Sequence, residues 1–295
     1  MPPIPPPRTS GYTETTDVPL YWAVYGSRGA PTLLVLHGGP GAHHDYLLPQ
    51  MLALADEYEL LFYDQRGGGR SKTDDRAPIT WETHVNDLAL VVAELEVDPL
   101  SLVGYSWGGL LALLYSIEAA AGRVAPMPDR LVLIDPAPVT RAYRAEFESE
   151  FARRQSGADV TRLRTELAAS DLRERDPDAY RQRAFELSVA GYFADPAATH
   201  NLTPFRVTGR VQQSVWDSLG DYNLLKPGAL DTVKLPALVL HGRQDPIPLA
   251  SSTAAAAALG ARLVPIDGAG HVPYVEQPAA LFAAIREFLD ATASG

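Results

Sequence analysis

Short apolar runs alternate with longer segments of helical periodicity along most of the chain. Continuous apolar runs are typical of strands that are buried on both faces of a parallel sheet. Between two such runs, the segment from Thr80 to Glu96 has apolar residues at helical spacing, and Thr80 can cap its first turn. This alternation predicts an α/β fold, a mostly parallel sheet with helices on both faces. The apolar runs are 32–36, 59–64, 100–105, 130–135, 237–242 and 261–266.

The N-terminal part follows a different pattern. Residues 1–10 are rich in proline, which disfavours helices and central strands, and this composition predicts an extended lead-in. From Gly11 onward polar and apolar residues alternate, which predicts two antiparallel strands that turn at 17–19. Further helices are expected at 46–55, 107–121, 250–259 and 278–289.

Strand-like runs are missing from residues 139–228. This segment contains helical patterns rich in Arg and Glu, which are broken at Gly157 and at two Asp-Pro pairs. We expect these helices to form a cap, or lid, inserted between two strands of the sheet. The predicted core therefore consists of 11–138 and 229–295, with the cap at 139–228.

The segment Leu100–Tyr115 contains Gly-x-Ser-x-Gly between an apolar run and an apolar helix. In this strand–turn–helix context the pentapeptide predicts a nucleophile elbow, in which Ser106 lies on a tight, strained turn. Gly104 and Gly108 fit such a turn because it has no room for side chains two residues either side of the serine. The elbow directs the Ser106 hydroxyl over the carboxyl edge of the sheet and the backbone N–H of Trp107 toward an attacked carbonyl oxygen.

A serine hydroxyl at neutral pH needs a base, and the base needs a carboxylate that orients it. In the elbow architecture the chain order is serine, acid, histidine, with the last two on loops after later strands. His271 follows the last predicted strand in a glycine-rich loop, which suits the base. Asp245, in the loop after 237–242, is the predicted acid, and Asp135 at the end of the preceding strand is the alternative.

An oxyanion site needs a second backbone N–H besides that of Trp107. The loop 37–41, with the sequence HGGPG, follows an early strand and is placed to provide it. We expect Gly39 to be the donor, with Gly38 as the alternative. Pro40 has no N–H and restricts its own backbone, which stiffens the loop.

Several polar residues near these loops are expected to play supporting roles. Asp64 and Arg66 should pair or cap locally and so shape the loop beside the site. His37 is expected to support the oxyanion loop, and His241 is expected to be structural. The residues that could rim the pocket are His43 and His44.

Composition narrows the classes of function. The net charge of −11 disfavours binding to nucleic acid or anionic membranes, and the 295 residues include no cysteine. The chain has neither a His–carboxylate set at helical spacing nor a nucleotide-binding glycine pattern, so we expect no metal and no cofactor. No apolar run approaches the roughly 20 residues of a bilayer span, and residues 1–10 lack a signal-peptide pattern, so a cytoplasmic protein is expected. The expected partner is a small-molecule or short-peptide substrate; the oligomeric state has no signature in the sequence.

Three motifs together resemble the proline iminopeptidase branch of the α/β-hydrolases. They are HGGPG at 37–41, YDQRGGGRS at 63–71 and GYSWGG at 104–109. The resemblance extends over nearly the whole chain, including the segments around Asp245 and His271 and a helical cap of similar size. It implies an α/β-hydrolase fold and release of an N-terminal residue, often proline, through an acyl-enzyme on Ser106.

Two departures from this family bear on the substrate. Family aminopeptidases hold the amine of the substrate with glutamates, one in the cap and one directly after the catalytic Asp. Here Pro246 follows Asp245, and the corresponding cap segment 201–205 has no carboxylate. A buried ammonium without a counter-charge is costly. Either another acid (Glu186, Asp217 or Asp221) substitutes, or the same machinery acts on esters, amides or lactones without a free amine.

Aromatic residues of the cap are expected to line an apolar acyl or prolyl pocket, although part of them can equally belong to the core. A non-catalytic binding protein with a vestigial site is a third alternative. It predicts a broken triad, which the sequence does not have. The predicted substrate-contacting residues are Gly38, Glu186, Tyr192, Phe205, Trp216 and Tyr222.

Overall fold

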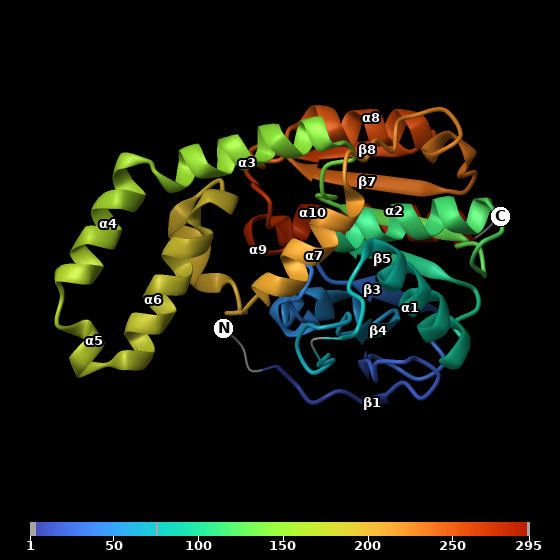
Figure 1. Cartoon of the computed structure of the whole chain (residues 1–295), viewed down its shortest axis with the longest axis horizontal. Helices are drawn as coiled ribbons and strands as arrows, with labels where there is room; N and C mark the ends of the chain where they lie inside the picture. Colours follow the sequence, from blue (N-terminus) through green and yellow to red (C-terminus); the bar gives the residue numbers. More distant parts are fainter. Residues whose placement is uncertain (1–3, 75, 294–295) are drawn as a thin grey trace.

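The computed structural model describes residues 4–74 and 76–293, and these form one large sheet with helices on both faces (Figure 1). The sheet has eight strands in the order β1-β2-β4-β3-β5-β6-β7-β8. Neighbours from β4 to β8 are parallel, whereas β1–β2 and β2–β4 are antiparallel. The predicted α/β fold with a mostly parallel sheet is therefore confirmed. The strands are β1 (Thr9–Tyr12), β2 (Tyr21–Tyr25), β3 (Thr32–Leu36), β4 (Glu59–Tyr63), β5 (Ser101–Tyr105), β6 (Arg130–Ile134), β7 (Ala237–Gly242) and β8 (Arg262–Ile266).

The central strands are apolar on both faces, as their continuous apolar runs predict. Leu34 and Leu36 of β3 pack into one hydrophobic cluster, and Leu33 and Val35 pack into the other. Each cluster is closed by helices that bury an apolar face against the sheet. The helices of the first face are α1 (Trp81–Glu94), α2 (Trp107–Ala120) and α8 (Leu249–Leu259); those of the second are α9 (Pro273–Glu276) and α10 (Pro278–Ala293).

Local sequence signals explain where α1 begins and why a second predicted helix is broken. The Thr80 hydroxyl accepts a hydrogen bond from the Thr83 N–H, and the Thr83 hydroxyl accepts one from the Thr80 N–H. The predicted helix 46–55 is wrong: the chain forms two 3₁₀ helices there, η1 (His44–Leu47) and η2 (Gln50–Leu54). Pro49 lies between them and has no N–H to continue a helical ladder.

The sheet begins within residues 1–10, the range predicted to be an extended lead-in. Strand β1 starts at Thr9, which pairs with Val24, and the N–H of Arg8 donates to the carbonyl of Val24 at 2.8 Å. Backbone pairing with β2 therefore extends into the range 1–10, of which residues 1–3 lie outside the described part.

Residues 139–228, which we call the cap segment, lie between β6 and β7. In Figure 1 helix α3 leads away from the sheet, α4, α5 and α6 project beyond it, and α7 returns to the core, where it contacts α1. Asp176 and Asp195, each followed by proline, accept hydrogen bonds from backbone N–H groups and start α6 and η4. The helices of this part are α3 (Arg141–Gln155), α4 (Ala158–Ala169), α5 (Leu172–Arg175), α6 (Pro177–Val189), η3 (Ala190–Tyr192), η4 (Pro196–Asn201) and α7 (Gly209–Leu219), with η5 (Leu230–Thr232) following it.

Within residues 4–74 and 76–293, every helix is too short or too polar to cross a lipid bilayer.

Candidate active site

Ser106 lies on a sharp turn between β5 and α2. Its backbone has φ 53° and ψ −118°, a left-handed conformation that is strained for any residue except glycine. A Cβ on Gly104 would lie 2.5 Å from the Gly108 carbonyl oxygen, and one on Gly108 would lie 2.1 Å from the Leu36 carbonyl oxygen. Both glycines are therefore required by close backbone packing. This is the geometry of the predicted nucleophile elbow.

The structure brings Ser106, His271 and Asp245 together in one hydrogen-bonded row. The Oγ of Ser106 lies 2.9 Å from Nε2 of His271, and Nδ1 of the same ring lies 2.8 Å from Oδ2 of Asp245. The other carboxylate oxygen, Oδ1, accepts a 2.7 Å hydrogen bond from the Ile247 N–H. Nδ1–H of the ring therefore donates to the carboxylate, which leaves Nε2 free to accept the serine proton.

Burial controls the protonation of this row. The His271 and Asp245 side chains are 6% and 0% exposed. Burial lowers the pKa of His271 to about 4 and raises the pKa of Asp245 to about 7. At a pH above these values the pair holds a neutral imidazole and an ionised carboxylate, the form in which Nε2 can act as a base.

The carboxylate that is hydrogen-bonded to His271 is that of Asp245, not that of Asp135, the alternative acid. Asp135 lies at the carboxyl end of β6, is fully buried, and its Oδ1 accepts a 2.7 Å hydrogen bond from the Gly242 N–H. Burial, and next the charge of Asp245, raise the pKa of Asp135 well above its ordinary value. Burial thus favours the neutral form of the Asp135 carboxyl. Its backbone, with φ 41°, is also left-handed.

Asp135, Asp245 and His241 bring potential metal-ligand atoms within 4.8 Å of one another. Each is already engaged by protein groups, however. Nδ1 of His241 lies 2.9 Å from the Ser252 hydroxyl, and its Nε2 lies 3.1 Å from the Ile247 carbonyl. Burial lowers the pKa of His241 to about 4 and keeps it neutral. These contacts agree with the structural role predicted for His241.

Two backbone N–H groups beside Ser106 are available to an oxyanion. Gly39 and Trp107 both line the cavity at Ser106, and neither N–H donates to another group in the described parts of the chain. The Gly38 N–H, the alternative donor, is already used: it donates to the Tyr46 hydroxyl at 2.7 Å. The arrangement thus favours Gly39 over Gly38.

A buried polar network holds the oxyanion loop in place. The Gln65 N–H donates to Nε2 of His37, and its side-chain amide donates to the His37 carbonyl. The Gln65 Oε1 accepts a 2.7 Å hydrogen bond from the Trp107 indole N–H. Burial lowers the pKa of His37 to about 4, so this ring remains a neutral hydrogen-bonding element. Gln65 thus links His37, at the start of the 37–41 loop, to the Trp107 side chain at the start of α2.

A cavity of about 610 Å³ opens at Ser106 between the sheet and the cap segment. Of the predicted substrate-contacting residues, Tyr192, Phe205 and Trp216 line it. Aromatic residues that the sequence did not single out also line it, namely Tyr46, Tyr105, Phe147, Phe151, Phe185 and Tyr274.

Gly38, Tyr222 and Glu186 do not line this cavity, contrary to prediction. Tyr222 is buried and its hydroxyl donates to the Pro138 carbonyl at 2.8 Å. Glu186 faces its own helix, where it accepts hydrogen bonds from Gln182 and Arg183. Both side chains thus have their hydrogen-bond partners within the protein, outside the cavity lining.

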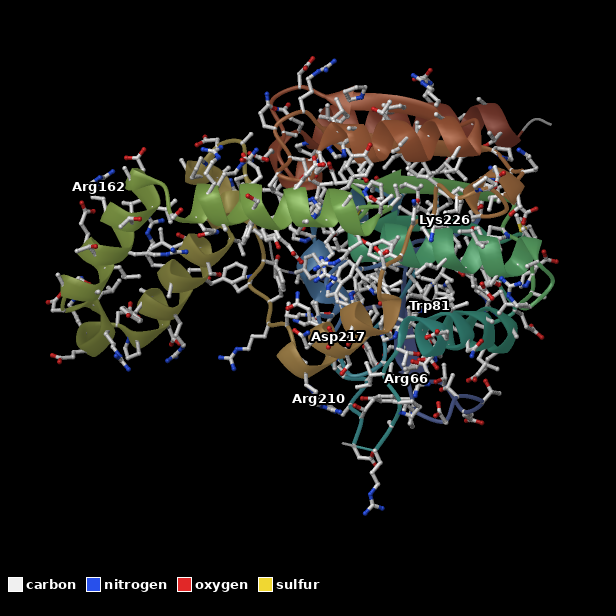
Figure 2. All side chains as sticks on the ribbon, turned by 45° about the horizontal axis from the view of Figure 1, so that its top comes forward. Arg66, Trp81, Arg162, Arg210, Asp217 and Lys226 are labelled. Carbon is white, nitrogen blue, oxygen red and sulfur yellow. The ribbon has the colours of Figure 1, made fainter. Side chains whose placement is uncertain are left out.

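The other proposed carboxylates are also outside the cavity lining. Asp217 lies on α7 (Figure 2), where its carboxylate accepts a hydrogen bond from Gln213, and Asp221 follows the same helix at an exposed position. Neither His43 nor His44 rims the cavity, contrary to prediction. His44 is buried against Asp64, with Nδ1 2.7 Å from Oδ1 of that carboxylate.

Asp64 and Arg66 do not pair with each other. Asp64 accepts hydrogen bonds from the backbone N–H groups of His44 and Arg70. Arg66 instead forms ion pairs with Asp87 and Asp17. Asp64 thus caps the loop after β4 locally through the Arg70 N–H, as one form of the prediction has it, whereas the partners of Arg66 lie elsewhere in the chain.

The loop of His271 has supports that the sequence analysis missed. The His271 N–H donates to the Tyr192 carbonyl at 2.7 Å, and the His271 carbonyl accepts from the Tyr105 hydroxyl at 2.9 Å. Glu276 accepts from the backbone N–H groups of Gly270 and Asp195. Most of these contacts join residues that are far apart in the chain, and no local sequence pattern indicates them.

The fold and this elbow site define the class of protein, a hydrolase with an α/β architecture. The chain matches the alpha/beta hydrolase family over residues 33–285 and belongs to that family. A proline iminopeptidase of Levilactobacillus brevis is 28% identical over 295 aligned residues, covering 92% of this chain and 93% of the relative. The predicted resemblance to the proline iminopeptidase branch is thereby confirmed.

Other matches are shorter or structural. A proline iminopeptidase of Lactobacillus crispatus is 39% identical over 102 residues, which are 33% of this chain and 35% of that relative. This chain therefore aligns with about a third of the length of that relative. The crystal structure of proline iminopeptidase from Mycobacterium smegmatis superposes with a TM-score of 0.69 at 21% identity, covering 96% of this chain and 98% of that one. At this identity the likeness shows the shared fold.

Proposed function

We propose that this protein is a serine hydrolase that works through an acyl-enzyme on Ser106. The Ser106 Oγ attacks the carbonyl carbon of the substrate while its proton moves to Nε2 of His271, and the N–H groups of Gly39 and Trp107 bind the oxyanion. Collapse of the tetrahedral intermediate breaks the bond to the leaving group, which takes the proton from His271. Water then attacks the acyl-enzyme with His271 again as base, which releases the acid and restores Ser106.

The observation that supports this proposal is the unbroken row of contacts from Ser106 through His271 to Asp245. A vestigial site in a binding protein has no reason to retain a strained serine together with two unused N–H donors. Turnover of 4-nitrophenyl acetate or butyrate tests the proposal. The Ser106→Ala and His271→Ala variants should lose at least about a thousandfold in kcat while their circular dichroism spectra stay unchanged. Wild-type turnover by Ser106→Ala would refute it.

Release of an N-terminal residue, often proline, from small peptides is the first candidate reaction. It is supported by the relatives, which are named proline iminopeptidases. The aromatic cavity has the size and the apolar character that a prolyl group requires.

Cleavage of esters, amides or lactones without a free amine is the second candidate, and the charges of the cavity favour it. Among the described residues that line the cavity, Glu148 is the one carboxylate, and it is paired with Arg144 and Arg141. An ammonium group entering the cavity would have no uncommitted carboxylate to bind. We therefore propose the second reaction as the better match to this cavity.

Parallel assays separate the two candidates. Prolyl 4-nitroanilide carries a free amine, and 4-nitrophenyl butyrate does not. The cavity predicts a kcat/KM for the ester that greatly exceeds that for the anilide. Because esters are intrinsically more reactive than anilides, acetyl-prolyl 4-nitroanilide serves as the reference: it has the same scissile bond as the prolyl anilide but no free amine. Faster cleavage of the free-amine anilide than of its acetylated form would establish the aminopeptidase reaction instead.

A further inference from the structure

One wall of the cavity carries charge, although most of its lining is aromatic. Arg144 and Glu148, one turn apart on α3, are the lining residues with charged side chains apart from the triad histidine, among the residues that the structure describes. Nε of Arg144 donates a 2.7 Å hydrogen bond to Oε1 of Glu148. Oε2 of Glu148 also lies 3.5 Å from a guanidinium nitrogen of Arg141. Two positive groups thus face one negative group, and the local excess charge is positive.

The guanidinium of Arg144 is held in place by an aromatic ring. Its central carbon lies 3.9 Å from the ring centroid of Trp216, a cation–π contact. The Trp216 ring in turn packs edge-on against Trp107, with ring centroids 5.5 Å apart. Because Trp107 follows Ser106 directly, this stack connects the Arg144 side chain to the oxyanion site through two rings.

The Arg144 guanidinium retains unused hydrogen-bonding capacity. Within residues 4–74 and 76–293, Nε is the one nitrogen of this group that donates a hydrogen bond to the protein. Nη1 and Nη2 remain, and these two N–H pairs form the planar fork that binds a carboxylate through two parallel hydrogen bonds.

Because Arg144 is less exposed than Glu148, its charge has the stronger effect inside the cavity. The Arg144 side chain is 19% exposed, whereas that of Glu148 is 44% exposed. Solvent screens the more exposed carboxylate to a greater extent, so an incoming group senses the arginine more than its partner. An anionic group is therefore favoured there, and an ammonium group would have to displace two arginines from Glu148.

We propose that Arg144 selects substrates whose acyl group carries a carboxylate, with Trp216 as the platform that orients the guanidinium. This inference rests on the proposed serine hydrolase function and specifies its substrate class. Glu148 limits the preference, because its charge partly neutralises Arg144 and repels an incoming anion.

The test uses mono-4-nitrophenyl esters of dicarboxylic acids of increasing length, each paired with the neutral 4-nitrophenyl ester of equal carbon number. The measured quantity is the ratio of kcat/KM for the anionic ester to that for its neutral partner, after subtraction of the enzyme-free rate. We expect the ratio to exceed one at the chain length that reaches Arg144. Arg144→Gln should lower this ratio by about tenfold or more, the effect of losing one charge-assisted contact.

Glu148→Gln should change the same ratio in the opposite direction, because it removes the negative charge and retains an oxygen that can accept from Nε of Arg144. A general loss of structure lowers the rates for both esters alike and leaves the ratio unchanged, so these opposite signs distinguish recognition from misfolding. Matched controls are Glu146→Gln, at an exposed position of the same helix, and Arg162→Gln on α4 (Figure 2); both should leave the ratio unchanged.

Two outcomes would overturn the inference without affecting the proposed hydrolase function. One is a ratio at or below one at every chain length in an enzyme whose neutral-ester turnover is lost in Ser106→Ala. The other is a preference for prolyl 4-nitroanilide that disappears in Glu148→Gln, which would make Glu148 the binding group for an amine. If every triad variant keeps its ester turnover, the hydrolase proposal itself is refuted.

Discussion

The backbone N–H of His271 donates a 2.7 Å hydrogen bond to the carbonyl oxygen of Tyr192, and their rings lie with centroids 5.1 Å apart. The histidine of the core is thereby bonded to the cap segment that covers it. Tyr192 also lines the cavity, and its ring packs at a tilt against that of Phe151 on α3. A change in the position of the cap segment would therefore move His271 relative to Ser106, so under the proposed function the cap positions the catalytic base.

This contact predicts that Gly270→Ala lowers kcat. A Cβ at position 270 would lie 2.2 Å from the Tyr192 carbonyl oxygen, a backbone atom that cannot yield without moving the cap segment or the His271 loop. Misplacing the base should reduce kcat for 4-nitrophenyl butyrate by about tenfold or more. Gly209→Ala is the matched control, because nothing lies within 4 Å of its added Cβ and its φ is ordinary. Equal kcat values in the two variants would contradict the prediction.

Asparagine substitutions distinguish the two candidate acids. Asp245→Asn removes the charge that holds Nδ1–H of His271, and kcat should fall by about a thousandfold or more. Asp135 is buried and its pKa is raised well above its ordinary value, so asparagine resembles the neutral carboxyl that burial favours. We expect Asp135→Asn to reduce kcat by less than about tenfold. A larger loss from Asp135→Asn than from Asp245→Asn would transfer the role of acid to Asp135.

The pH profile of kcat/KM follows from the coupled titration of His271 and Asp245. Burial raises the pKa of Asp245 to about 7 and lowers that of His271 to about 4. As the pH falls through about 7 the pair takes up its first proton. Whether this proton binds to the Asp245 carboxylate or to the His271 ring, it weakens Nε2 as a base for Ser106. Activity should therefore rise with pH to a plateau above this value. A profile that stays flat down to about pH 5 would contradict the assignment.

The sequence predicted the triad because the elbow has a local signature. Gly104, Ser106 and Gly108 occur together between an apolar run and an apolar helix, and close backbone contacts on both sides of the serine require this pattern. The chain order of elbow enzymes then limited the acid and the base to loops after later strands. Asp245 and Asp135 were harder to separate, because β6 and β7 are parallel neighbours and end side by side.

The lining of the cavity was harder to predict, because it depends on which face each cap helix presents. Trp216 and Tyr222 are close in sequence, yet Trp216 lines the cavity and the Tyr222 hydroxyl is bonded to the Pro138 carbonyl. Glu186 was a reasonable candidate for binding an amine, but Arg183 on the same helix binds its carboxylate. Side-chain direction on a helix follows from tertiary packing, which residue types alone do not specify.

Trapping the acyl-enzyme is the most direct measurement of the central claim, that Ser106 is the nucleophile. The enzyme is mixed with excess 4-nitrophenyl butyrate, quenched in acid within the first turnover and digested for peptide mass spectrometry. We predict a mass increase equal to one butyryl group on the peptide that contains Ser106, and its absence from Ser106→Ala and from the acid-quenched control without ester. A butyryl group found only on another residue, together with full ester turnover by Ser106→Ala, would contradict the account.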